Sequence, residues 1–341
     1  MKTSAIILTV IALLLLVFSS CREVKVTTRV NPDGTFTRII TVTGDSTDNF
    51  TTDLPFPVDE TWKSMFSRDT TDSTKFIQTY VKSFRNSHEL NEELKSDTSS
   101  YKNLKREISV TKRFRFFFSY LTFKEVYKSA NPFTCLDYHE YLTEEDILWF
   151  NELKIPLTPA DSIRQDEASD KVFKFFQRSV IAEVDSIMRD GIKRLNNPQL
   201  NQLDISVYHD SVYKDFEQWN FKQVDEFIVL YSKWSGIEAF TLLNNLEPPL
   251  FEDFEKKLAT LENVFEIEGY INEVEMPGLI TATNSAMLNG NQVRWDFQPL
   301  TIIVRDFEMY AESRVINYWA FVVAGIVLLL LVVLLVIKAV R

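Results

Sequence analysis

Histidine, cysteine and glycine are scarce in this chain, and their scarcity removes several classes of enzyme. Among 341 residues there are 3 His, 2 Cys and 8 Gly. The histidines are far apart and lack the spacing of a metal site. So few glycines leave no Gly-rich loop for phosphate, and two cysteines are too few for a disulfide framework. The sequence therefore predicts no catalytic residue, no metal and no cofactor, and we expect a protein that is not an enzyme.

One thiol–imidazole pair has the residue types of an activated nucleophile. Cys135 and His139 are four residues apart, which on a helix would place both side chains on one face. Pro132, just before them, indicates a loop instead, and no third group that could orient the imidazole is evident. We therefore expect neither residue to be catalytic, and an envelope hydrolase is the weakest of the functions considered.

Basic residues are also in deficit, which bears on the partners. The whole chain has 37 Lys and Arg against 48 Asp and Glu. Lys2, Lys338 and Arg341 lie in terminal segments without acids, so residues 22–314 carry 34 basic and 48 acidic residues, a net charge of −14. Nucleic acid requires a basic footprint. We therefore exclude nucleic acid as a partner and read the charge as support for solubility.

The first residues have the pattern of an export signal that ends in a lipid-carrying cysteine. Ala5 to Phe18 is an apolar run, and Ser19 and Ser20 precede Cys21. The run is too short for a comfortable membrane span. We predict a lipoprotein signal peptide at 1–20, cleavage before Cys21, and acylation of Cys21 by fatty acids such as palmitate. The alternative is an uncleaved signal anchor with an incidental cysteine.

The last residues predict a transmembrane helix over 315–337. This stretch has no charge and is long enough to cross the hydrocarbon core. Tyr318 and Trp319 are placed as interfacial aromatics, and Lys338 and Arg341 lie in a tail, 338–341, that the positive-inside rule assigns to the cytoplasm. We therefore expect a bacterial inner (plasma) membrane protein, lipid-anchored and single-pass, with its body in the periplasm or outside the cell.

Strand patterns dominate both ends of the exported body, 21–314, and helical patterns its middle. Asn31–Thr35 has the turn chemistry of a hairpin. In 142–263 apolar residues recur at helical spacing, and Thr143 with Asp146 predicts a helix start. We predict an α+β fold: an antiparallel sheet of N- and C-terminal strands, a large helical insertion at 142–263, and one C-terminal transmembrane helix. We also expect the first and last strands to share a sheet.

Residues 108–127 are dominated by aromatic and β-branched side chains and predict one long, bent strand. Alternation would put Phe114, Phe116, Phe118 and Tyr120 on one face of it. We expect this face to lie in the core; the alternative is that it lines an apolar cavity for a lipid.

No linker separates the body from either predicted anchor, because strand patterns begin next to Cys21 and end near Glu312. A linker that reached far from the bilayer would need tens of polar residues. We therefore expect Arg22 and Arg314 to contact lipid head groups. We also expect the lipid on Cys21 to hold the first strand at the membrane beside the last one.

Short motifs occur in the two β-rich ends, after the signal that ends at Cys21 and before the terminal span: Asn31–Thr35, Met276-Pro277-Gly278, Asn284, Asn289-Gly290 and Val293-Arg294-Trp295. In their order along the chain, these motifs resemble those of LppM-type envelope lipoproteins. The resemblance implies an α+β domain at the outer face of the plasma membrane, with lipid or glycolipid binding as its function, and offers no catalytic residues. The long helical block lies outside the resemblance.

We therefore expect a non-enzymatic, doubly anchored envelope lipoprotein that binds membrane lipid or a membrane protein close to the bilayer. The alternative is a structural or assembly subunit of an inner-membrane complex, with the helical block as its docking surface.

Overall fold

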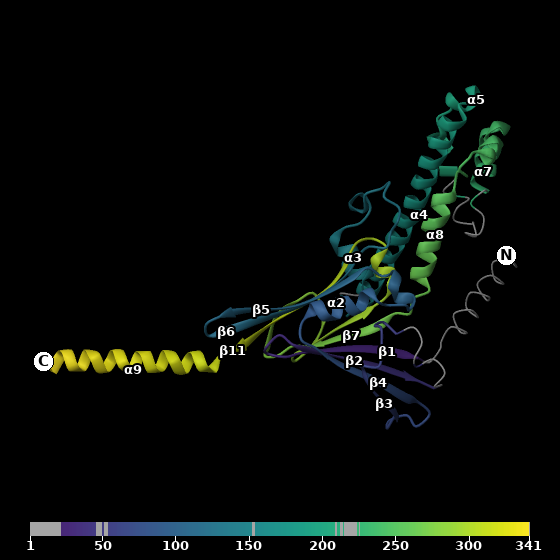
Figure 1. Cartoon of the computed structure of the whole chain (residues 1–341). Helices are drawn as coiled ribbons and strands as arrows, with labels where there is room; N and C mark the ends of the chain where they lie inside the picture. Colours follow the sequence, from purple (N-terminus) through teal and green to yellow (C-terminus); the bar gives the residue numbers. More distant parts are fainter. Residues whose placement is uncertain are drawn as a thin grey trace. The chain divides into compact units, whose positions relative to one another are not determined.

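The computed structural model describes residues 22–340 except 46–49, 51–53, 152–153, 209, 212–213, 215–223 and 225. The chain forms two compact units, each built from separate stretches of sequence (Figure 1). The β unit comprises Met1–Tyr127, Gly269–Phe297 and Glu308–Arg341, and the helical unit comprises Lys128–Glu268 and Gln298–Phe307.

Seven of the described strands form the first sheet of the β unit, in the order β3-β4-β2-β1-β7-β10-β9. Neighbouring strands are antiparallel, except that β1 and β7 are parallel. The strands are β1 Glu23–Val30, β2 Phe36–Gly44, β3 Lys63–Arg68, β4 Phe76–Phe84, β7 Tyr270–Glu275, β9 Met287–Asn289 and β10 Gln292–Phe297.

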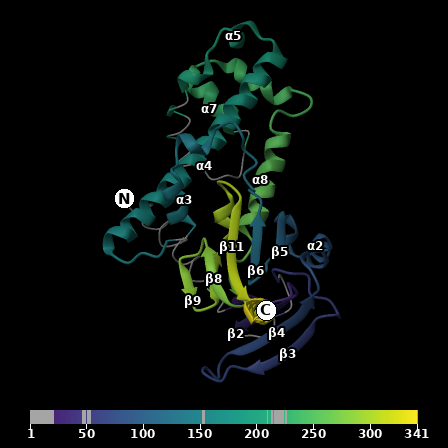
Figure 2. The ribbon, with the colours of Figure 1, turned by 90° about the vertical axis from the view of Figure 1, so that its left-hand side faces the viewer.

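The second sheet has four described strands in the order β5-β6-β11-β8, and Figure 2 shows β11 between β6 and β8. Two short helices, α2 (Ser87–Lys95) and the 3-10 helix η1 (Ser100–Asn103), precede β5 in the chain. The strands are β5 Arg106–Arg115, β6 Phe118–Tyr127, β8 Leu279–Thr283 and β11 Phe307–Ile316.

The predicted α+β class is confirmed, and both sheets combine N-terminal with C-terminal strands. The predicted turn between β1 and β2 is also present: Gly34 has φ 96° and its amide donates to the Asn31 carbonyl at 2.9 Å. The expectation that the first and last strands share a sheet was wrong, because β1 is in the first sheet and β11 in the second. Strand alternation specifies which face of a strand is buried but leaves its neighbours open.

The prediction of one long strand over 108–127 was also wrong. The segment is a hairpin, in which Arg115 pairs with Phe118 and the residues between them form the turn. Phe116 makes the turn with a positive φ of 30°. Two-residue hairpin turns usually carry Gly, Asn or Asp at such positions, so a Phe-Phe turn has no conventional sequence signal.

Most of the described helices are in the helical unit, and α4 is its longest element. The core of the unit forms where α4 packs against α8 and their neighbours, for example at Val180, Val184 and Phe254. The elements are the 3-10 helices η2 Tyr138–Glu140, η3 Ile205–Tyr208, η4 Glu238–Asn245 and η5 Pro299–Ile302, and the α-helices α3 Glu144–Phe150, α4 Pro159–Leu195, α5 Pro198–Asn201, α7 Glu226–Ser235 and α8 Glu252–Phe265.

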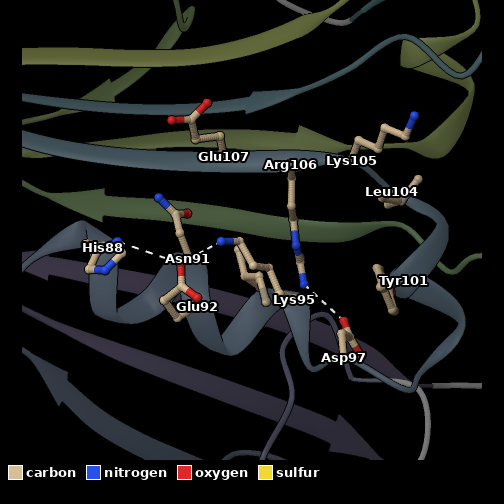
Figure 3. A pocket seen from close by; sticks show the side chains of 11 residues that line it. His88, Asn91, Glu92, Lys95, Asp97, Tyr101, Leu104, Lys105, Arg106 and Glu107 are labelled. Carbon is tan, nitrogen blue, oxygen red and sulfur yellow. Dashed lines mark hydrogen bonds and ion pairs between the residues drawn. The ribbon is translucent and has the colours of Figure 1, made fainter.

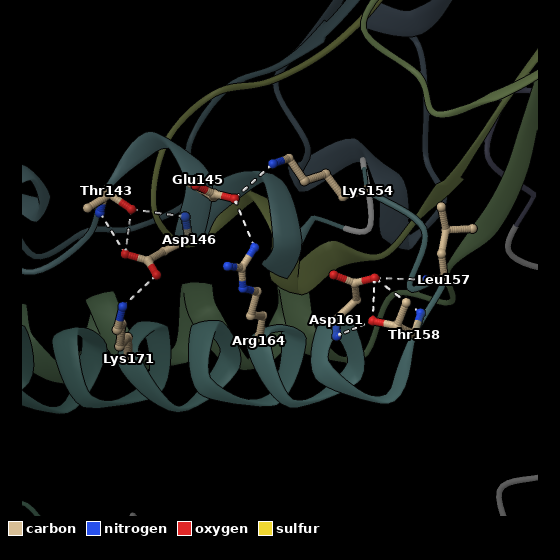
Figure 4. Close-up of polar contacts among 9 residues, drawn as sticks. All are labelled: Thr143, Glu145, Asp146, Lys154, Leu157, Thr158, Asp161, Arg164 and Lys171. Carbon is tan, nitrogen blue, oxygen red and sulfur yellow. Dashed lines mark hydrogen bonds and ion pairs between the residues drawn. The ribbon is translucent and has the colours of Figure 1, made fainter.

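Two capping boxes start the first two α-helices of this unit, α3 and α4 (Figure 4). Thr143 accepts from the Asp146 amide while the Asp146 carboxylate accepts from the Thr143 amide, as the sequence predicts. Thr158 and Asp161 repeat the arrangement at the start of α4. Lys171 on α4 binds Asp146 at 2.6 Å, so the first capping box also ties α3 to α4 (Figure 4).

Candidate membrane-interface site

The C-terminal helix α9, Tyr318–Val340, is long and apolar enough to cross a membrane. It belongs to the β unit, and a single residue, Asn317, separates its start from the end of β11. Figure 1 shows the β5–β6 turn and the end of β11 beside the start of α9. The site is therefore built from a helix start and a strand turn that are 200 positions apart in the chain.

Asn317 fastens this junction with three hydrogen bonds. Its backbone amide donates to the Phe117 carbonyl at 2.9 Å, and its Nδ2 donates to the Phe116 carbonyl at 2.8 Å. Ser119 Oγ in turn donates to Asn317 Oδ1 at 3.0 Å. Both carbonyls of the hairpin turn are thus satisfied by the residue that leads into α9.

Aromatic rings fill the same junction. Trp319 lies parallel to Phe114, with ring centroids 5.9 Å apart, and edge-on to Phe116 at 5.8 Å. Two residues further into α9, Phe321 contacts Phe117 with centroids 4.7 Å apart. We call residues 114–118 the hairpin tip. Its rings pack on the first turn of α9 while remaining partly exposed, with 54% of Phe114 and 45% of Phe116 accessible.

The four aromatic residues expected to share one strand face are therefore arranged differently. Phe114 ends β5, Phe116 is in the turn, and Phe118 and Tyr120 are on the returning strand β6. The structure brings the first three together around α9 instead of along one strand. Sequence reasoning had no means of finding Phe321 as their partner, because the contact depends on the β5–β6 turn.

Basic side chains surround the hairpin tip, although the body as a whole is acidic. Lys112, Arg113 and Arg115 are on the exposed end of β5. The predicted head-group residue Arg314, on β11, lies over the Phe118 ring with its guanidinium carbon 4.8 Å from the centroid. The exposed Arg113 is 3.9 Å from the half-buried Glu312, so its charge is partly opposed. This end of the β unit thus combines exposed aromatic rings with basic side chains close to them.

The other predicted interface residues have separate positions. Tyr318 and Trp319 form the exposed start of α9 and Lys338 lies in its last turn. Residues 1–20, Cys21 and Arg341 lie outside the described residues.

Arg22 is described, and its position overturns one expectation. β1 runs parallel to β7, and Glu275 at the end of β7 leads through a short turn to Leu279, which pairs with Arg314 near α9. The end of β1 therefore lies toward α9, and the start of β1, which Arg22 immediately precedes, lies at the opposite end of the strand. Eight strand residues span about 25 Å. The first strand does not begin beside the end of the last one.

Cys135 and His139 do not form a nucleophilic pair in the structure. Cys135 donates to Glu183 at 3.1 Å, and the same carboxylate binds Lys257. His139 is bonded to Asp137 at 2.7 Å. Desolvation of the thiol, assisted by its bond to Glu183, raises the pKa of Cys135 to about 11. A thiol with so high a pKa holds very little thiolate at neutral pH, so this cysteine is a weak nucleophile.

A hollow of about 470 Å³ lies between α2 and the start of β5 (Figure 3). Its charged walls are largely paired with one another: Lys95 with Glu92 at 2.6 Å, and Arg106 with Asp97 at 3.4 Å. No group of acids, histidines and cysteines in the described part of the chain is arranged to hold a metal ion. The charges within each of these two pairs therefore balance, so neither pair presents a net charge to a ligand.

A buried ion pair links the two sheets of the β unit. Arg38 on β2 donates to Glu125 on β6 at 2.7 Å, and both side chains are fully buried. Tyr127 and Asn272 also donate to the Glu125 carboxylate, at 2.8 and 3.1 Å. Arg106 also lies near this pair. Its guanidinium carbon and that of Arg38 are each 4.3 Å from the ring centroid of Phe56. No sequence pattern indicates this pair, because its members are 87 positions apart in the chain.

No family model and no curated protein matches the chain. Among solved structures, the chain is similar to the NMR structure of the folded domain of LppM from Mycobacterium tuberculosis. The identity is 9% and the TM-score 0.28, with 87% of this chain and 91% of the other covered.

Proposed function

We propose that this chain is a non-enzymatic envelope protein that holds a folded body against the membrane and binds membrane lipid there. The observation that carries the proposal is the junction at Asn317, where the membrane-crossing candidate α9 is fastened to the β unit without a linker. A body on a flexible stalk could leave the surface, but this one is held by three hydrogen bonds and stacked rings.

The proposed location is the plasma membrane of a bacterium, with the body on the exported side and Lys338 in the cytoplasm. The exposed rings and basic side chains at the membrane end of the β unit favour lipid as the partner. Aromatic side chains at a membrane surface lie at the level of the lipid head groups, and basic side chains contact the lipid phosphates.

Lipid binding predicts that phospholipid stays with the protein when the membrane is removed gently. After purification in a mild detergent, mass spectrometry should detect phospholipid in at least equimolar amount. An Arg115→Gln, Arg314→Gln variant should retain less, because it lacks two of the cations at the hairpin tip. A Lys63→Gln, Arg68→Gln variant on the exposed strand β3 is the control. Lipid-free wild-type protein would rule out the proposal.

Acylation of Cys21 after removal of residues 1–20 is part of the same proposal. A Cys21→Ser variant is expected to lose incorporation of radiolabelled palmitate. Its membrane retention should be unchanged, because a spanning helix anchors a protein far more firmly than one lipid does. Label that persists in this variant would contradict acylation at Cys21.

A second function, as an assembly subunit of a membrane complex, is favoured by the edge strand β3. All six of its residues are exposed, among them Met65 and Phe66, and among the described strands it pairs only with β4. Open edges of this kind accept a strand from another chain. Chemical cross-linking in intact cells distinguishes the two functions, because a subunit would give one discrete protein adduct from β3.

A further inference from the structure

We infer that the hairpin tip is a second membrane-inserted element: Phe116 and Phe117 enter the outer boundary of the hydrocarbon beside the first turn of α9, while Arg115 and Arg314 meet lipid phosphates. This inference rests on the proposed function in one respect, namely that α9 crosses the bilayer.

The depth of the hairpin tip follows from the length of α9. A hydrocarbon core of about 30 Å takes about 20 helical residues. Counted back from Lys338, the first charged residue beyond the span, such a length begins at Tyr318. Phe321 is then one turn inside the boundary, and Phe117 lies against it at 4.7 Å between ring centroids. The turn therefore reaches the depth at which α9 enters the hydrocarbon.

The backbone of the turn meets the chief requirement of a lipid environment. Hydrocarbon offers no water, so exposed amide and carbonyl groups there must be bonded within the protein. Asn317 supplies a donor to each of the carbonyls of Phe116 and Phe117. A turn that faced water would gain little from such capping, since solvent could satisfy both oxygens.

The choice of residues in the turn gives independent support. Phe116 has a φ of 30°, in the region that favours glycine. Backbone of this kind is strained for a residue that has a Cβ, and it is concentrated at functional positions. A water-facing turn would be served better by Gly-Asn, which adopts such angles freely and is polar. The chain has two large apolar rings there instead, and both remain partly exposed.

The surrounding charges fit the same placement. Arg115 is the last residue of β5 before the turn, and Arg314 is at the end of β11, three residues before Asn317. Long cationic side chains at this height bury their stems along apolar surface and extend their charges to the phosphates. The guanidinium of Arg314 over Phe118 already has this arrangement of ring and cation.

The test is photo-crosslinking of the full-length chain in vesicles of phosphatidylethanolamine and phosphatidylglycerol. Benzoylphenylalanine replaces Phe117 in one protein, Leu328 in the middle of α9 in a second, and Phe66 on β3 in a third. Phe66 is the matched control, because it is an exposed Phe on a strand of the same unit, 54% accessible. After irradiation, mass spectrometry should find phospholipid adducts at positions 117 and 328 and none at position 66.

The outcomes separate this inference from the proposed function. Adducts at 328 without adducts at 117 would overturn the inference and leave the membrane span intact. The absence of adducts at 328 would overturn both.

A second variant tests whether misfolding could account for a loss of lipid adducts. Phe116→Gly with Phe117→Asn gives the turn a sequence suited to its backbone, so the hairpin should form at least as well as in the wild type. A photoprobe at Phe114 should nevertheless lose its lipid adducts in this background. Undiminished adducts at 114 would show that the two rings do not hold the tip in the lipid.

Discussion

Replacing Glu125 by glutamine is expected to lower the free energy of unfolding of the β unit by about 3–5 kcal/mol. The change keeps the shape of the side chain but removes the negative charge that Arg38 faces at 2.7 Å. Arg106, also buried, loses the same neighbouring charge and keeps its contact with Asp97. Breaking one side of a buried pair leaves uncompensated charge in a medium that solvates it poorly, which accounts for the large cost.

The measurement is amide hydrogen exchange, followed by mass spectrometry on peptides from β2 and β6, because it reports the stability of this unit alone. Lys124→Gln is the matched control. Lys124 precedes Glu125 on β6, but its pair with Glu308 is exposed, and its loss should cost less than about 1 kcal/mol. Equal protection in the two variants would show that the buried pair contributes no more than a surface one.

The same pair predicts how stability depends on pH. Burial alone would raise the pKa of Glu125, but Arg38 and Arg106 outweigh it, and the pKa lies below its ordinary value of 4.5. A carboxylate with a lowered folded-state pKa contributes stability that is fully present above its unfolded-state pKa and is lost as the pH falls through the folded-state pKa. The wild type should therefore lose stability below about pH 4.5, and Glu125→Gln should lack this component.

Local chemistry made part of this fold predictable. The turn at Asn31–Thr35, the capping box at Thr143 and the apolar helix α9 each follow from a few adjacent residues, and the structure contains all three. The α+β class followed from the order of such segments along the chain.

The functional site was less accessible, because it depends on which distant segments meet. The sequence identifies Phe114 and Phe118 as candidate site residues, but the alternation of side chains along a strand places both on a single strand. The turn at Phe116 contains no Gly, Asn or Asp, the residues that usually form such turns. The sequence therefore contains no signal that predicts it. Asn317 belongs to no motif in the sequence, and its role depends on two carbonyl groups about 200 positions earlier in the chain.

The direction of β1 also changes the meaning of the two proposed anchors. Arg22 lies about one strand length from the end of the β unit that bears α9. A lipid on Cys21, one residue before Arg22, can enter the bilayer crossed by α9 only if the β unit lies low against the surface. The lipid would then act on the tilt of the β unit and not on its attachment.

Replacing Gly278 by alanine tests how the membrane end of the β unit is held together, and is expected to cost about 3 kcal/mol. Gly278 has φ 81°, where a Cβ is strained, and an added methyl group would overlap the carbonyl oxygen of Arg314 and lie 3.2 Å from a methyl of Val315. Both neighbours are on β11 just before Asn317, and the clash is with backbone, which cannot rotate away as a side chain can.

Gly290→Ala is the matched control for this change. Gly290 also has a positive φ, 62°, but an added methyl group there meets no atom within 4 Å. It should therefore show the conformational cost alone, about 1–2 kcal/mol. Hydrogen exchange in peptides from β8 and β11 gives the difference between the variants. Gly278→Ala should also shift the strand that positions Asn317, so that lipid adducts at Phe117 fall while those at Leu328 persist. Equal effects of the two alanines would mean that the close approach of Gly278 to Arg314 does not hold the span to the sheet.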